Sequence, residues 1–386
     1  MMTDVNIASR KFAKATIKDV SEAAGVSITT VSHFMNGRKF ACSVETAKRI
    51  QEAIRTVHYA PGPSARRARY QATRTIGLCL DSPDDISETY DPRRTYHEGL
   101  SRAIVREADE SSYALLHYPR NVRHGDSAEA FLDGRVDGLI FGSGPCDRRV
   151  HDLADAGLPT VIVNRLANAP DACGVVAFNE SDAVSLAMDH LWELGHRRIA
   201  HLAGPVGPAV AGIDLLQAST ILHSGAVSTQ ADVFPSDSAI RRCEAYIRYM
   251  RDRNGFDPSL LVSLGSWADG SEIDVDEVLC RWFSLPKPPT AVFCVNDSLA
   301  IALNAAARRA GIDVPGTLSI VGVGNKVAVE EAVPAITSVD IPAEAAGREA
   351  MRLLLRMLGG DELTHEDLRI VMPVTRLIVR SSAARI

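Results

Sequence analysis

The stretch TIKDVSEAAGVSITTVSHFMNG, Thr16–Gly37, decides the first fold assignment of this 386-residue chain. Thr16 can accept a hydrogen bond from a first-turn N–H, and Asp19 can answer it, which predicts the start of a helix. Gly25 tolerates the positive φ of a tight turn, and Ser27 is a good N-cap for the helix that follows. The pattern therefore predicts two short helices joined by a three-residue turn.

A third helix is predicted to begin after Ser43 and to brace the first two. Its apolar stripe recurs at helical spacing and consists of Val44, Ala47, Ile50, Ile54 and Val57. In the second helix, residues 28–35, we expect Val31 and Met35 to face inward. Such a unit is a helix-turn-helix, whose second helix is narrow enough to enter the major groove of DNA. The alternative is a three-helix fold without a nucleic-acid partner.

The charge distribution also favours a head that binds nucleic acid. Residues 1–74 contain 13 Lys and Arg against 5 Asp and Glu, although the whole chain carries a net charge of −6. A small basic module on a large acidic body is typical of polyanion binding. The alternative is a basic tail that only improves solubility.

The composition is that of a folded globular protein, with 46% hydrophobic and 23% charged residues. No apolar run reaches about 18 residues, so no membrane span is predicted. The first residues lack the apolar core of a secretory signal. Seven cysteines without a CxxC pair predict a reducing compartment, the cytoplasm.

The first motif resembles the DNA-binding signature of the lactose repressor/galactose repressor family of bacterial transcription regulators. The matching positions are Thr16, Asp19, Val20, Ala24–Ser27, Thr30–Ser32, Asn36 and Gly37. The resemblance implies that the bases are read by Ile28, Thr29 and His33. It implies that the phosphates are contacted by Ser27, Thr30, Ser32 and Asn36. For Thr30 and Ser32 the alternative is that they are simply polar residues on the helix surface. His33 stands where most members have Arg, and imidazole cannot grip guanine with two hydrogen bonds, so we expect a different base preference.

Residues 61–74 are expected to form a hinge, because two prolines and a glycine mark a linker. The resemblance implies that the hinge helices of a dimer enter the minor groove through Ala65, Arg66, Arg67 and Ala68. Ala68 replaces the family's wedge leucine, so a weaker DNA kink is expected. Electrostatic binding of the arginines in a narrowed groove is one alternative, and a flexible basic linker is another.

From Thr75 onward, short apolar runs alternate with helical stretches, which predicts an α/β body with parallel sheets. The expected strands are 75–80, 113–117, 136–141, 160–163, 198–202, 291–295 and 318–322, with a helix at 96–108. Two lobes with a ligand cleft at the carboxyl ends of the strands suit a body of about 310 residues.

The resemblance continues through this body and implies a two-lobed core similar to periplasmic sugar-binding proteins. It rests on residues 137–140, 191–200, 296–300, 314–315, 319–322 and 337–339. The expected domains are a tail (1–15), the helix-turn-helix (16–60), the hinge (61–74), a first lobe (75–164 and 324–338) and a second lobe (165–323 and 339–386). An atypical insertion is expected at about 206–237.

The effector site that the resemblance implies consists of Asn296, Asp297, Arg242 and Trp267. The carboxylate of Asp297 can accept two hydroxyls, and its alternative role is to cap the next helix. The guanidinium of Arg242 suits a carboxylate, a phosphate or vicinal hydroxyls. Arg242 and Trp267 both have a structural role as the alternative. Departures from the family pattern occur at 81–94, Asn179 and Gly324-Asn325, so we expect either an unusual ligand or the loss of the effector.

The sequence therefore predicts a cytoplasmic, homodimeric, sequence-specific DNA-binding regulator, with repression as the family default. It would bind a near-palindromic operator and respond to a small-molecule effector, a sugar or a related polar metabolite, between the lobes. No membrane partner, cofactor, metal or enzyme activity is expected. Histidines 190, 196 and 201 do not share a helical face, and no GxGxxG, GxSxG or phosphate-loop motif occurs. The alternative is a ligand-binding sensor or enzyme-like protein with weak, non-specific DNA binding.

Overall fold

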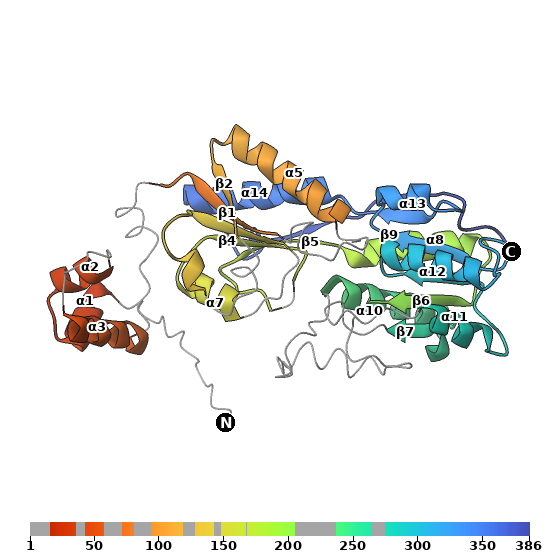
Figure 1. The fold of residues 1–386 in the computed structure, drawn as a ribbon, viewed down its shortest axis with the longest axis horizontal. Helices are drawn as coiled ribbons and strands as arrows, with labels where there is room; N and C mark the ends of the chain where they lie inside the picture. The colour runs from red at the N-terminus through yellow and green to blue at the C-terminus, as the bar shows by residue number, and fades with distance from the viewer. Residues whose placement is uncertain are drawn as a thin grey trace, which may run out of the picture.

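The structure is a computed structural model that describes residues 16–35, 43–57, 72–80, 94–118, 128–142, 148–166, 168–204, 237–263 and 275–386. Within these ranges, a unit of three helices precedes a body built on two six-stranded sheets (Figure 1). No helix in the described ranges has the length and apolar character needed to cross a bilayer.

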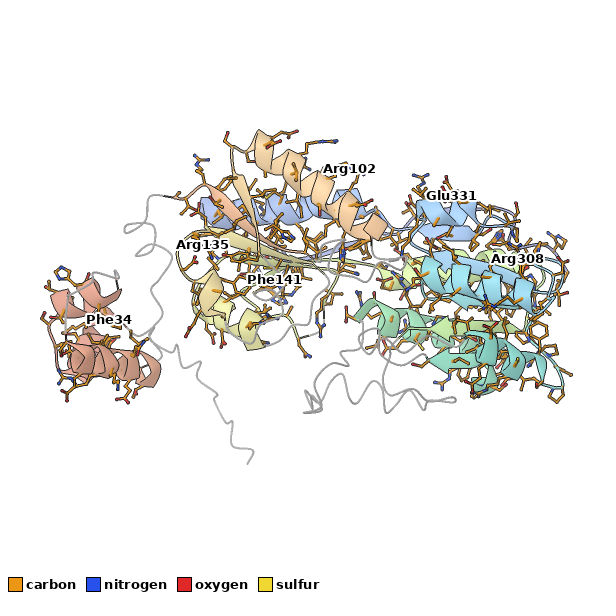
Figure 2. All side chains as sticks on the ribbon, viewed as in Figure 1. Phe34, Arg102, Arg135, Phe141, Arg308 and Glu331 are labelled. Atoms are coloured by element: carbon orange, nitrogen blue, oxygen red, sulfur yellow. The ribbon has the colours of Figure 1, made fainter. Side chains whose placement is uncertain are left out.

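The head consists of three helices: α1 (Ile17–Ala24), α2 (Ile28–Met35) and α3 (Val44–Thr56). They share a core in which Val20, Val31 and Ile50 have no exposed surface. Phe34 packs against this core, and Figure 2 labels it within the head. The predicted inward orientation of Val31 is therefore confirmed, and of the predicted stripe of the third helix Ile50, Ile54 and Val57 belong to this core. The side chains of Met35 and Val44 lie outside the described part of the structure.

The first sheet has the strand order β11-β5-β4-β3-β1-β2, and all its pairings are parallel. Its strands are β1 (Thr75–Cys79), β2 (Ala114–His117), β3 (Gly138–Gly142), β4 (Thr160–Val163), β5 (Gly174–Phe178) and β11 (Arg369–Met372). Its helices are α5 (Arg94–Glu110), α7 (Arg148–Asp155) and α14 (Ala343–Gly359), with a short 3-10 turn at Glu129–Phe131. Helices α5 and α14 lie so close that a Cβ at Gly347 would collide with the carbonyl oxygen of Leu100.

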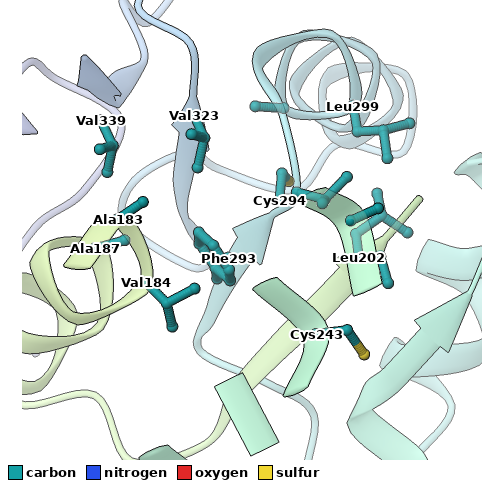
Figure 3. Close-up of a cluster of buried hydrophobic side chains, with 14 of the residues drawn as sticks. Ala183, Val184, Ala187, Leu202, Cys243, Phe293, Cys294, Leu299, Val323 and Val339 are labelled. Atoms are coloured by element: carbon teal, nitrogen blue, oxygen red, sulfur yellow. The ribbon is translucent and has the colours of Figure 1, made fainter. Parts of the chain in front are cut away.

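The second sheet has the strand order β12-β10-β9-β8-β6-β7. Its strands are β6 (Ile199–Ala203), β7 (Leu261–Ser263), β8 (Ala291–Cys294), β9 (Ser319–Val323), β10 (Thr337–Asp340) and β12 (Arg376–Ile378). Its helices are α8 (Glu180–Glu193), α10 (Asp237–Asp252), α11 (Val275–Phe283), α12 (Asp297–Arg309) and α13 (Val327–Glu331), with a 3-10 turn at Pro258–Leu260. Among the described strands, only β10 and β12 pair antiparallel. Figure 3 shows the core, in which Phe293 and Val323 lie near Ala183 and Ala187 of α8.

The predicted alternation of strands and helices is confirmed, but the predicted division into lobes differs from the strand pairing. The prediction assigned 165–323 to the second lobe, whereas β5 pairs with β4 of the first sheet. It assigned 324–338 to the first lobe, whereas β10 pairs with β9 of the second sheet. It assigned 339–386 to the second lobe, whereas β11 pairs with β5 of the first sheet. The reason is that the chain crosses between sheets three times, and both sheets have the same strand–helix pattern.

Several predicted features lie outside the described residues. These are Asn36, the hinge residues Ala65, Arg66, Arg67 and Ala68, the aromatic Trp267, and nearly all of the segments 81–94 and 206–237.

Candidate DNA-binding and ligand-binding sites

The start of α1 is fixed by the predicted pair of reciprocal hydrogen bonds. The N–H of Thr16 donates to the Asp19 carboxylate at 2.6 Å, and the N–H of Asp19 donates to the Thr16 hydroxyl at 3.4 Å. The hydrogen bonds from Thr16 lower the pKa of the Asp19 carboxyl below its ordinary value. The capping box is therefore present, and it sets where the motif begins.

The turn that aims α2 is also fixed as the sequence predicts. Gly25 adopts a left-handed conformation with φ of 62°, which a Cβ would strain. The Ser21 hydroxyl donates to the Val26 carbonyl at 2.7 Å. Ser27 caps α2, because its Oγ accepts the N–H of Thr30 at 3.0 Å.

The outward face of α2 carries the residues expected to read bases. At 3.6 residues a turn, Thr29 and His33 lie within about 20° of the direction opposite to the buried Val31. Thr29 is exposed and His33 is partly exposed. Ile28, with 46% of its surface exposed, begins the helix and points about 60° away from Val31, so it lies apart from Thr29 and His33. The face therefore offers a hydroxyl and an imidazole, and the aliphatic Ile28 is exposed at the N-terminus of the helix.

The residues expected to contact phosphate lie around the same helix. Ser27 is exposed, and its hydroxyl is 2.8 Å from that of Thr30. Ser32 is partly exposed on the next turn of α2. Hydroxyl groups and first-turn amides of a helix are common partners of phosphate oxygens.

The carboxyl ends of the parallel strands in both sheets, which exclude the antiparallel β12, lead toward the junction of the lobes. Three connections cross it, from β5 to α8, from β10 to α14 and from β11 to β12. In parallel α/β proteins, ligands bind beyond these strand ends. The segments that follow β1, β2, β3, β6 and β7 lie outside the described residues, so the described part of such a site comes from β4, β5, β8 and their neighbours.

Arg242 of α10 lies at this junction and is buried. Its Nε donates to Glu180 Oε2 at 2.6 Å, and a terminal guanidinium nitrogen donates to the Val295 carbonyl at 2.6 Å. The Glu180 side chain is 1% exposed. The arginine is thus held by the protein itself, and it joins α10 to α8 and to the end of β8.

Asp297, the first residue of α12, is fully buried. Its Oδ2 accepts the N–H of Lys326 at 2.8 Å, and its Oδ1 accepts the hydroxyl of Ser338 at 2.5 Å. Burial raises the pKa of this carboxyl, although both hydrogen bonds oppose that rise. A Cβ on Gly322 would lie 2.5 Å from Oδ1, so the strand needs glycine there. Asp297 therefore connects β8 with β9 and β10.

The alternative in which Asp297 caps the following helix is wrong, because Asn296 is the cap. The Oδ1 of Asn296 accepts the N–H of Leu299 at 3.0 Å, and its backbone is extended. Asn179 has the same function for α8, where its Oδ1 accepts the N–H of Ser181 at 3.2 Å. Asn179 follows β5 directly and Asn296 is the second residue after β8, which is where an N-cap belongs in a β–α connection.

Several buried polar atoms near the junction have no hydrogen-bond partner, among them Tyr96 Oη, Asn164 Oδ1 and Glu180 Oε1. Burial, followed by the charge of Glu180, raises the pKa of the Tyr96 phenol. Asn164 directly follows β4 and has a φ of 63°. These atoms come from elements on both sides of the junction. A ligand hydroxyl or a water could donate to the oxygens of Asn164 and Glu180, and it could accept the hydroxyl proton of Tyr96.

Sequence reasoning found Arg242 but missed Glu180, Tyr96 and Asn164. The only available signal was position, since Asn164 and Glu180 closely follow strands. Two of the three histidines make hydrogen bonds within the protein: a ring nitrogen of His196 lies 2.9 Å from the Thr290 hydroxyl, and one of His201 lies 2.8 Å from the Phe293 carbonyl. Among the described residues, no cluster of three or more His, Cys, Asp or Glu side chains could hold a metal ion.

Comparison with known proteins extends over nearly the whole chain. Residues 16–62 match the profile described as bacterial regulatory proteins, lacI family, and residues 188–383 match that of the periplasmic binding protein-like domain. The PurR transcriptional repressor of Vibrio atlanticus is 26% identical over 349 residues, which cover 89% of this chain and 92% of the relative. The PurR repressor of Aliivibrio fischeri strain MJ11 is 27% identical, and the match covers 95% of this chain and 98% of that relative.

Solved structures show the same fold. The regulator CelR, in complex with cellobiose, superposes with a TM-score of 0.66 at 24% identity, covering 96% of this chain and all of its own. The lac repressor dimer bound to operator and the anti-inducer ONPF gives 0.59 at 22% identity, with the same coverage. The second profile alone spans half of the chain, and the first coincides with the helix-turn-helix. The chain therefore belongs to the lacI family of bacterial regulatory proteins, which are DNA-binding transcription regulators with a periplasmic-binding-protein-like body.

Proposed function

We propose that this chain represses transcription by binding, as a homodimer, to a near-palindromic operator in the bacterial cytoplasm. The observation that carries the proposal is the outward face of α2, where Thr29 and His33 lie opposite the buried Val31. Two such heads related by two-fold symmetry fit two half-sites of a palindrome. The homologous PurR proteins are repressors, which supports the sign of the regulation.

The roles of the single residues in the head follow from their chemistry. We propose that Ile28 contacts a thymine methyl and that Thr29 and His33 donate to base edges. Phosphates would be held by Ser27, Thr30, Ser32 and Asn36. The minor groove would be entered by Ala65, Arg66, Arg67 and Ala68.

A small polar ligand would bind at the junction of the lobes and change the affinity for the operator. Support comes from the buried acceptors without partners, Asn164 Oδ1 and Glu180 Oε1, which suit a hydroxyl-bearing ligand such as a sugar. The neighbour CelR was solved with cellobiose. Arg242, Trp267, Asn296 and Asp297 remain the other proposed members of this site. For Arg242 and Asp297, a ligand would compete with the partners that already hold them.

Regulation of this kind requires binding and a change of shape, without a chemical step, and we propose that the chain is not an enzyme. The chain would act by occupying the operator. The effector would change that occupancy because it binds one arrangement of the lobes more tightly than the other.

The test is fluorescence anisotropy of the full-length chain with a duplex that it has selected and with a scrambled duplex of equal length. We expect at least about 10³-fold tighter binding of the selected duplex, and binding that weakens steeply with salt. His33→Ala should lower the ratio of the affinities for the selected and the scrambled duplex. His151→Ala, which removes an exposed histidine from α7, should leave this ratio unchanged. Equal binding of both duplexes would refute the proposal and favour a sensor with non-specific DNA affinity.

A further inference from the structure

Two hydrogen bonds join the N-terminal end of α10, which packs on the second sheet, to the strand ends of the first sheet. The Asp237 carboxylate accepts the N–H of Leu166, which lies just beyond β4, at 3.1 Å. A terminal guanidinium nitrogen of Arg241 donates to the carbonyl of Phe178, the last residue of β5, at 3.0 Å. The other terminal nitrogen of Arg241 is 3.0 Å from Asp237 Oδ2, and this ion pair, which lacks hydrogen-bond geometry, links the two contacts.

These contacts are shielded from water. The side chains of Asp237 and Arg241 are 7% and 21% exposed, and Phe178 has no exposed surface. Hydrogen bonds that involve a charged group and little solvent are among the stronger ones in proteins. The three chain crossings are covalent connections between the lobes, whereas this contact is noncovalent and can break when the lobes move apart.

We propose that Asp237 and Arg241 form an inter-lobe latch, a pair of positioning residues that holds the two lobes closed. The latch carboxylate and guanidinium come from one lobe, and their backbone partners at Leu166 and Phe178 come from the other. Opening the lobes must break both hydrogen bonds, and it leaves the amide of Leu166 and the carbonyl of Phe178 to find water.

The latch also lies next to the proposed ligand site. Arg242 follows Arg241 on α10 and holds Glu180, the second residue after Phe178. A ligand that displaces Arg242 from Glu180 therefore moves the same turn of helix that carries the latch. The effect of the latch on operator binding rests on the proposed function, whereas its effect on lobe closure does not.

The inter-lobe distance tests the latch directly. Nitroxide labels would be placed on Cys280, an exposed cysteine of α11, and on a cysteine introduced by His151→Cys in α7 of the other lobe. Cys42→Ser and Cys146→Ser would remove competing thiols. Pulsed electron resonance on the full-length chain then gives the distribution of distances. Mixing with unlabelled chain limits each dimer to one labelled subunit.

In this background we expect Arg241→Met to add a longer distance, with the open population rising about tenfold. Asp237→Asn should produce the same component, and the double variant should go no further, because both residues belong to one latch. The matched control is Arg253→Met, at the residue that directly follows α10, whose ion pair with Asp189 lies within one lobe at 3.5 Å. A distribution in Arg241→Met identical to that of the control would overturn the latch.

Operator affinity separates the two claims. In the unlabelled chain, Arg241→Met should change affinity for the selected duplex at least threefold, and Arg241→Lys should restore part of it. The control should not change. Opened lobes with unchanged operator affinity would uphold the latch and refute its coupling to DNA. Failure to select any duplex would refute the proposed function while leaving the distance result intact.

Discussion

Replacing Arg242 with methionine tests whether the buried ion pair at the lobe junction is structural. Arg242→Met keeps most of the side chain's length but leaves the carboxylate of Glu180, which is 1% exposed, without its 2.6 Å partner. It also leaves the Val295 carbonyl without its donor. Breaking a buried pair on one side costs roughly 3–5 kcal/mol, because an uncompensated charge remains in a poorly solvated place.

The assay is urea unfolding followed by tryptophan fluorescence. Trp192 of α8 and Trp282 of α11 belong to this lobe, so their fluorescence reports on its unfolding. Adding Glu180→Gln to Arg242→Met should recover at least half of the loss, because the stranded charge is then removed. The control is Arg309→Met. Its ion pair with Asp276 is also 2.6 Å long but more than half exposed, and its loss should cost less than about 1 kcal/mol. Equal losses in Arg242→Met and the control would refute this reasoning.

Three further predictions concern other parts of the chain. His33→Arg should change the preferred bases in a selection experiment more than the total affinity, because Arg can bind guanine with two hydrogen bonds; an unchanged consensus would remove His33 from the base-reading face. Burial lowers the pKa of His201 from 6.5 to about 4. The neutral imidazole therefore contributes fully to the free energy of unfolding above pH 6.5, and this contribution falls by about 3 kcal/mol as the pH drops to 4. His201→Gln should flatten the pH dependence of the unfolding free energy in that window, and an unaltered slope would contradict the shift. Asp297→Ala should lower the unfolding free energy by roughly 2–4 kcal/mol, because it strands the Lys326 N–H and the Ser338 hydroxyl, yet the folded variant should still bind the operator. Unchanged stability would show that these bonds contribute little.

The head could be predicted closely because its signals are local. The capping box joins residues three apart, and the turn depends on one glycine with positive φ. The predicted second helix, 28–35, coincides with the observed one. Propensity, capping and apolar spacing all indicate the same elements here, which is the condition under which sequence patterns are most reliable.

The lobes could be predicted as a class but not divided correctly. Strand β5 has five apolar or small residues that are entirely buried, a pattern without alternation that is easily overlooked. Because both lobes use the same strand–helix alternation, the pattern does not show to which sheet a strand such as β10 belongs. That information lies in long-range pairing, for example between Thr337 and Val321.

The ligand site shows the same limit. The arginine of the motif was found, but Glu180 lies 62 residues earlier in the chain, and nothing near Arg242 indicates it. The position of Asp297 after a strand indicated a polar role. The hydrogen bonds that its oxygens accept come from Lys326, after β9, and from Ser338 on β10, and nothing near Asp297 in the sequence indicates them. A residue that matches a motif can therefore be placed on its element from the sequence. Its hydrogen-bond partners depend on the whole fold.

The most direct test of the central claim is selection from randomised duplex DNA by the full-length chain at physiological salt. The claim is that a dimer of this chain reads sequence through α2. It predicts enrichment of a two-fold symmetric consensus, whose outer bases change when Thr29 or His33 is substituted. Failure to enrich any sequence, or an asymmetric consensus that is indifferent to both substitutions, would contradict it.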